Sequence, residues 1–249
     1  MTRLSVSRYR ASLYHLSISL VVFVFLAYLV LVHWFPDFFY AIDGGWEGMR
    51  IIIGVDLVLG PILTLMVFKA GKPGLKLDLT LIGLFQSICL LAGVYVVYSE
   101  RPLFFVYYES HFYSLSADTF TRYGVQVPDL SKYTDKPPIH VYIQLPEHPI
   151  EEADVRRILV QDRVPAWLYA PLFTPLDGNM GEVLKHGIEE TELRERDIHH
   201  NLDDWLETND GSIEDFVFIP IHSRYRDAFV GILAEHGQFV DVLEIPPPL

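Results

Sequence analysis

Residues 43–79 read DGGWEGMRIIIGVDLVLGPILTLMVFKAGKPGLKLDL, and this stretch decides the fold. It contains an apolar run at residues 51–68, close to the ~20 residues that a helix needs to cross a bilayer. A short loop rich in glycine and lysine follows at 69–78, and a second apolar run occupies 79–98. Two apolar runs of spanning length joined by a turn predict a transmembrane helical hairpin.

A further apolar run lies upstream, at residues 14–35, without any charge that is fixed at neutral pH. At ~1.5 Å per residue it is about 33 Å long, enough to cross a hydrocarbon core of ~30 Å. Its basic flank resembles that of a signal peptide, but the run is longer than a signal-peptide core of ~7–15 residues, and no small-residue cleavage site follows it. We therefore expect residues 1–98 to form a membrane domain of three transmembrane helices.

The distribution of lysine and arginine predicts the orientation of these helices. Three arginines lie in the N-terminal tail and three lysines in the loop at 69–78, whereas the loop at 36–50 holds one arginine beside three acidic residues. Because loops rich in lysine and arginine stay in the cytoplasm, the N-terminus and the second loop should be cytoplasmic. Residues 99–249 should then lie across the membrane, which for a bacterial inner membrane is the periplasm.

Residues 99–249 differ in composition from the membrane domain. The 249-residue chain has a formal net charge of −13, to which residues 99–249 contribute −15 and residues 1–98 contribute +2. The acidic part has no basic stripe with which to bind nucleic acid. The single cysteine, Cys89, lies inside the third apolar run, which excludes an internal disulfide framework and a thiolate zinc cluster.

The acidic part is expected to fold as a soluble α+β domain, because it contains no apolar run of spanning length. Its clearest strands should be an aromatic-rich pair at 104–110 and 112–118, and a half-buried strand at 139–146. Residues 181–207 favour one or two exposed acidic helices. After a strand at 214–221, the pattern at 227–245 favours a hairpin that turns at 235–238, with a helix over 226–236 as the alternative.

Residues 197–204, DIHHNLDD, combine two histidines with three acids. On a helix His199 and Asp203 would be neighbours, but adjacent histidines point apart and the spacing lacks the logic of a zinc motif. We expect a solvated acidic face here. The sequence contains no nucleophile elbow, phosphate-binding loop or dinucleotide fingerprint, so we expect no metal site, no cofactor and no catalytic residues.

Asp56 is the most informative single residue, because an ionised carboxylate in lipid costs at least ~2.5 kcal/mol. It lies five residues into the second apolar run, about 7–8 Å below the periplasmic interface. It could contact a partner helix or belong to an ion path; alternatively it reaches the headgroups or pairs with His33 or Arg50 inside this bundle. In each case Asp56 indicates a surface that does not face lipid alone.

Small and aromatic residues lie near Asp56. Gly54 and Gly60 leave a surface that another helix can approach closely, either from this bundle or from another protein. Pro61 removes a backbone hydrogen bond and should bend the helix. Trp46 and the aromatics at 38–40 are typical of an interfacial belt, with a recognition loop as the alternative. The candidate partner-binding residues are therefore Asp56, Gly54, Gly60, Pro61, Trp46 and Arg50.

The stretch at 43–79 resembles the hallmark of the TfpX/TfpZ-type family of type IV pilin accessory proteins. The three-span topology, the sequence ERP at 100–102 and the α+β domain are also similar to that family. The resemblance implies a small inner-membrane protein that helps pilin to be stabilised, assembled or moved in and out of the pilus, and it carries over no catalytic residue. The motif falls here on Gly44, Gly45, Trp46, Gly48, Arg50, Gly54, Asp56, Leu57, Gly60, Pro61, Thr64, Lys69, Gly71, Lys72, Lys76 and Asp78.

We therefore expect a non-enzymatic chaperone or assembly factor. Its helices would hold the single transmembrane helix of a pilin subunit, and its acidic domain would hold the periplasmic head. The expected partners are pilin, other pilus assembly proteins and membrane lipid, with no nucleic acid. The alternative is a membrane enzyme that acts at the periplasmic face on pilin or a lipid-linked substrate, with Asp56 and the aromatic loop forming its pocket.

Overall fold

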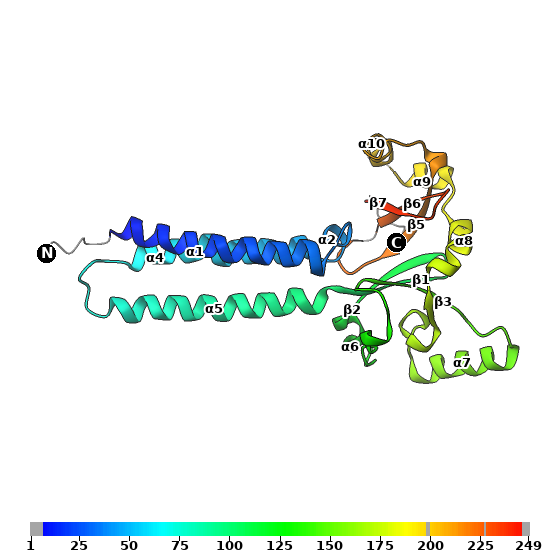
Figure 1. The fold of residues 1–249 in the computed structure, drawn as a ribbon, viewed down its shortest axis with the longest axis horizontal. Coiled ribbons are helices and arrows are strands. Elements are labelled where there is room, and N and C mark those ends of the chain that lie inside the picture. Colours follow the sequence, from blue (N-terminus) through cyan, green and yellow to red (C-terminus); the bar gives the residue numbers. More distant parts are fainter. Residues whose placement is uncertain (1–6, 198–199, 227, 246–249) are drawn as a thin grey trace. The chain divides into compact units, whose positions relative to one another are not determined.

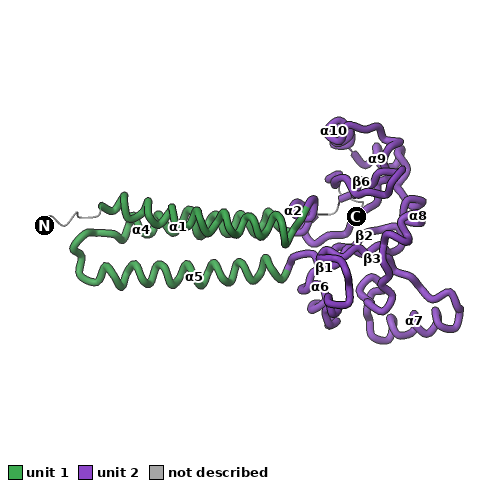
Figure 2. Tube along the Cα trace, viewed as in Figure 1, with its two compact units in different colours: residues 1–36, 44–99 green, residues 37–43, 100–249 purple. Residues whose placement is uncertain are grey.

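The chain folds into two compact units, which Figure 2 distinguishes by colour. The computed structural model describes residues 7–197, 200–226 and 228–245. Unit 1 comprises residues 1–36 and 44–99 and is built from helices, whereas unit 2 comprises residues 37–43 and 100–249 and is built around a β-sheet (Figure 1).

Among its described residues, unit 1 contains three helices that are long and apolar enough to cross a membrane, at Arg8–Trp34, Gly45–Val67 and Leu75–Glu100. The first joins α1 (Arg8–Tyr28) to a π-helical segment (Leu29–Trp34), and the third is α5 (Leu75–Glu100). The second joins α3 (Gly45–Ile52), a π-helical segment (Ile53–Leu59) and α4 (Gly60–Val67).

The second helix begins before its apolar run, because Gly44 adopts the left-handed conformation (φ 91°) that starts α3 at Gly45. Because of this early start, Asp56 lies at the middle of the Gly45–Val67 helix. At the far end a tight turn leads into α5, where Lys72 and Asp78 form an ion pair of 2.6 Å. Asp78 stands in the first turn of α5, where a carboxylate interacts favourably with the helix dipole.

Unit 2 contains a seven-stranded mixed sheet in the order β4-β3-β1-β2-β5-β6-β7. The strands are β1 (Pro102–Tyr108), β2 (His111–Ser116), β3 (Ile139–Ile143), β4 (Phe173–Pro175), β5 (Phe216–His222), β6 (Ala228–Leu233) and β7 (Phe239–Leu243). β1 pairs antiparallel with β2 and parallel with β3, while β2 pairs parallel with β5. The expected strand pair at 104–118 and the hairpin at 227–245 are confirmed; the alternative helix over 226–236 is wrong.

Short helices complete unit 2. They are α2 (Phe39–Ile42), α6 (Ala117–Arg122), α7 (Pro149–Asp162), α8 (Met180–Val183), α9 (Glu190–Arg196) and α10 (Asn201–Thr208). Phe120 of α6 packs with β1–β3 in one buried cluster, and Leu193 of α9 and Trp205 of α10 pack with β5–β7 in another. The acidic segment 181–207 is divided among α8, α9 and α10, and the described residues Asp197 and His200, between α9 and α10, do not have α-helical geometry.

The loop between the first two long helices is built into unit 2. Phe105 of β1 is fully buried, and its ring lies 5.1 Å from Phe39 and 5.9 Å from Phe38, measured between ring centroids. Phe38 and Phe39 are themselves 7% and 2% exposed. The interpretation of these aromatics as an interfacial belt is therefore wrong: they cover one face of β1 and supply part of the core of unit 2.

Asp43 ends this loop as a buried carboxyl group, 4% exposed. The Ser114 hydroxyl donates a hydrogen bond of 2.6 Å to its Oδ2, and the backbone N–H of Arg224 donates another. Ser223 Oγ bonds to the carbonyl oxygen of Ile42 at 2.8 Å. Burial raises the pKa of Asp43 to about 7, against the opposing effect of these two hydrogen bonds to its carboxyl group. Polar contacts as well as aromatic packing thus hold the loop in unit 2.

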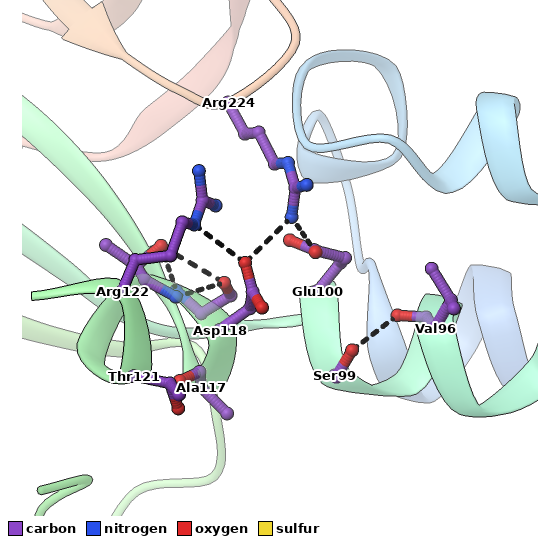
Figure 3. A network of polar contacts seen from close by, with 10 residues as sticks. Val96, Ser99, Glu100, Ala117, Asp118, Thr121, Arg122 and Arg224 are labelled. Atoms are coloured by element: carbon purple, nitrogen blue, oxygen red, sulfur yellow. Dashed lines mark hydrogen bonds and ion pairs between the residues drawn. The ribbon is translucent and has the colours of Figure 1, made fainter. Parts of the chain in front are cut away.

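A second polar network stabilises the point where the chain enters β1 (Figure 3). Arg224 forms ion pairs with Glu100 and, at 3.2 Å, with Asp118 of α6. Asp118 also accepts from Arg122 Nε at 2.7 Å. Glu100 is buried, so the guanidinium group of Arg224 compensates a carboxylate that has lost its water.

Replacement of Asp43 by Asn should change how stability depends on pH. Between the ordinary pKa of 3.8 and about 7, the folded protein keeps a proton on Asp43 that the unfolded chain releases, so the free energy of unfolding should fall as pH rises. The slope within this interval is about 1.4 kcal/mol per pH unit. Asn does not titrate, so Asp43→Asn should gain stability relative to wild type as pH rises.

Thermal unfolding of the full-length proteins in detergent at about pH 5 and about pH 8 measures this effect. A difference between variant and wild type that is the same at both pH values would contradict the buried, protonated state of Asp43.

Candidate functional site

A cavity of about 460 Å³ lies among the long helices of unit 1, and we call it the polar cavity. Its lining residues on α1 recur every three or four positions, so they share one helix face; they are Ala11, Tyr14, His15, Ile18, Ser19 and Val22. On α5 the lining residues repeat in the same way and are Leu79, Gly83, Gln86, Ser87 and Leu90. Asp56 and Thr64 of the second helix complete the lining. Three helices therefore contribute both polar and apolar side chains to the lining of one cavity.

The backbone of the second helix departs from regular α-helical geometry next to Pro61. Proline has no N–H to donate within a helix. The π-helical segment at Ile53–Leu59 immediately precedes it, and Pro61 stands in the first turn of α4. Wide π-helical turns occur where the regular hydrogen-bond ladder is interrupted, frequently at functional sites.

Hydrogen bonds join α1 to the second helix beside the cavity. His15 Nδ1 lies 2.6 Å from Thr64 Oγ1, and Ser12 Oγ donates to the carbonyl oxygen of Pro61 at 2.8 Å. Hydrocarbon offers these groups no alternative partners, so each bond helps to fix the register of the two helices.

Asp56 has no such partner. Its residue is 7% exposed and lines the cavity, and it forms no hydrogen bond or ion pair with any residue that the structure describes. The two internal partners considered from the sequence are engaged elsewhere. His33 packs edge-on against Tyr28, and Arg50 bonds to Glu47 at 3.2 Å.

Gln86 presents a second unsatisfied group. It is 4% exposed, and both its amide nitrogen and its amide oxygen are buried without a hydrogen-bond partner in the described part of the chain. The amide sits over Gly60, where an added Cβ would lie 1.9 Å from Gln86 Nε2 and 3.0 Å from His15 Nε2. A side chain at position 60 would therefore displace the Gln86 amide and crowd the His15 ring.

The other candidate residues do not gather at this cavity. Gly54 is exposed, and a Cβ added there would meet nothing within 4 Å. Trp46 is 42% exposed at the start of α3, and the Arg50 guanidinium lies 5.6 Å from its ring centroid. Of the six candidates, the structure places Asp56, Gly60 and Pro61 at or beside the polar cavity and keeps Gly54, Trp46 and Arg50 apart from it.

Sequence reasoning missed His15, Ser19 and Gln86 as members of the site. The available signal was their polarity inside runs that are otherwise apolar, with His15 and Ser19 one helical turn apart. Thr64 belongs to the motif at 43–79, but only the structure pairs it with His15.

The histidine-rich segment of unit 2 has structural roles. The carboxylate of Asp197 accepts hydrogen bonds from the backbone N–H groups of Asn201 (2.9 Å) and Leu202 (2.7 Å), so it caps α10. Asp203 pairs with Arg194 at 3.0 Å. His199 lies outside the described residues, and among those described no group of three or more His, Cys, Asp or Glu side chains is placed to hold a metal ion.

The bond between His15 and Thr64 should contribute measurably to stability. Thr64→Val and His15→Phe each remove one partner, and each should lower the free energy of unfolding by about 1 kcal/mol, as is typical of interhelical hydrogen bonds in membranes. The double variant should lose less than the sum of the two. A double-mutant cycle on the detergent-solubilised chain measures this coupling, and strict additivity would show that the two residues do not interact.

Comparison with known proteins gives the chain a family. It is 32% identical over 96 residues to the fimbrial assembly protein of serogroups C1 and C2 from Dichelobacter nodosus, a match that covers 37% of this chain and 72% of that protein. Its identity to the fimbrial assembly proteins of serogroups I and E1 from the same organism is also 32% over 96 residues, but the match spans only 37% of each. No protein-family model and no solved structure matches the chain. Because the match covers 72% of the first of these relatives, the chain belongs to the family of fimbrial assembly proteins.

Proposed function

We propose that this protein is an inner-membrane accessory factor of type IV fimbriae that holds the pilin subunit before assembly, and that it belongs to the TfpX/TfpZ-type branch. The observation that carries the proposal is the relation to fimbrial assembly proteins in a chain whose three apolar helices surround a polar cavity. A fimbrial subunit awaiting assembly is expected to need both a place in the membrane for its helix and protection for its head. Units 1 and 2 offer one surface for each.

The proposed orientation places the N-terminus in the cytoplasm and unit 2 in the periplasm. Residues 37–43 belong to unit 2 together with residues 100–249, so the first loop and the C-terminal part must share one side of the membrane. The lysines of the second loop lie at the opposite end of the hairpin, where the positive-inside rule places the cytoplasm.

The proposed role is non-enzymatic. In unit 2, Asp197 caps α10 and Glu100 forms an ion pair with Arg224, so these two acidic side chains have structural roles. In unit 1 the side chains of His15 and Thr64 form a hydrogen bond with each other. These arrangements favour a protein that binds and releases its partner over one that transforms it.

Deletion of the gene should lower both pilin abundance and the number of surface fimbriae, because a subunit without its membrane partner is exposed to proteolysis and aggregation. Immunoblots of pilin in the membrane fraction and electron microscopy of sheared fimbriae measure the two effects, and the wild-type gene supplied in trans should restore both. Unchanged pilin and unchanged fimbriae in the deletion strain would refute the proposed function.

A periplasmic reporter should verify the topology. Alkaline phosphatase fused after residue 249 should be active, and the same enzyme fused within the loop at 69–74 should be inactive, because it requires export to fold. Activity of only the loop fusion would invert the orientation and remove the basis for an interaction between unit 2 and a periplasmic head.

A further inference from the structure

The polar cavity contains two groups whose hydrogen bonds are not made within the described chain. Asp56 offers acceptor oxygens, and the Gln86 amide offers one donor group and one acceptor. Burial of such groups without a partner is unfavourable in any apolar medium, and most of all in a bilayer, which has no water to replace it. Both residues line one space, and the covered Gln86 amide comes within reach of an occupant when its side chain turns toward that space.

The position of the cavity selects among possible occupants. Asp56 lies at the middle of the Gly45–Val67 helix, about 16 Å from either end at helical rise. Lipid headgroups lie at the ends of such a helix and not at its middle. The group that meets Asp56 must therefore be carried into the bilayer on an apolar support.

The shape of the cavity indicates that this support is a helix. The lining residues of α1 and α5 each extend over about three helical turns. The walls include Ala11, Ser19, Gly83 and Ser87, and small residues of this kind allow the backbones of membrane helices to approach closely. A Cβ added at Gly83 would meet nothing within 4 Å, so this part of the wall is open.

We propose that the polar cavity binds the transmembrane helix of the pilin subunit, and that a polar side chain near the middle of that helix donates a hydrogen bond to Asp56 and pairs with the Gln86 amide. This inference rests on the proposed function and makes it specific. Asp56 and Gln86 recognise the partner, while the bond between His15 and Thr64 maintains the cavity that receives it.

Site-specific photo-crosslinking in living cells tests the inference. A photoreactive amino acid at Gly83, on the cavity wall, should form an adduct with pilin in cells that express the full-length chain and its cognate pilin. The matched control is Gly93, on the same helix but outside the cavity lining, where an added Cβ also meets no atom within 4 Å. It should give little adduct. Ser87, an exposed residue of the same wall, replaces Gly83 if that variant does not accumulate in the membrane.

Asp56→Leu separates recognition from structure. It should reduce the Gly83 adduct by roughly tenfold, which corresponds to the loss of one or two interhelical hydrogen bonds. The same variant should raise the thermal stability of the chain purified without pilin, because leucine replaces a carboxyl group that has no partner. A residue with a purely structural role would show the opposite change in stability. Gln86→Leu should behave in the same way.

Three outcomes would overturn the inference: equal pilin adducts at positions 83 and 93, adducts only with lipid or with a second copy of this chain, or pilin adducts that survive both substitutions. If deletion of the gene lowers pilin while the Gly83 adduct is missing, the proposed function stands and the cavity is not the binding site. If deletion leaves pilin and fimbriae unchanged, the proposed function itself fails.

Discussion

Hydrocarbon offers no hydrogen bonds, and this constraint governs the membrane part of the protein. A polar group on a membrane helix must find its partner in protein or remain unsatisfied at considerable cost. His15 and Thr64 meet the constraint by bonding to each other, whereas Asp56 and Gln86 do not meet it within the described chain. All four line the same cavity, so the satisfied pair and the unsatisfied pair are parts of one arrangement.

The number of long helices could be predicted from the sequence, because a bilayer sets a minimum length of apolar residues that composition alone reveals. The position of Asp56 within its helix could not, since it depends on where the helix begins. Gly44 starts α3 before the apolar run, and this shifts Asp56 to mid-helix. The neighbours of Asp56 at the cavity were also beyond prediction: helix packing decides which faces meet, and a lone Gln86 in an apolar run does not disclose what lies opposite.

In unit 2 the strands with alternating or aromatic sequences were predictable, and so was the hairpin of β6 and β7. α7 was missed because it has no buried residue and therefore no apolar stripe; the ion pairs of Arg156 with Glu152 and of Arg157 with Asp154 support it on its surface. The prediction for Phe38 and Phe39 was wrong because the sequence alone does not show whether an aromatic residue near a membrane faces lipid headgroups or covers a sheet. The contacts of both rings with Phe105 of β1 show that they cover the sheet.

The incorporation of residues 37–43 into unit 2 has a consequence for biosynthesis. Phe38 and Phe39 leave the ribosome before the second and third long helices, yet their ring partners Phe105 and Phe239 come from the first and last strands of the sheet. Phe38 therefore cannot make all of its ring contacts until β7 has been synthesised. These non-covalent contacts join the segments of chain that flank the second and third long helices, so unit 2 cannot be completed before both helices have been synthesised.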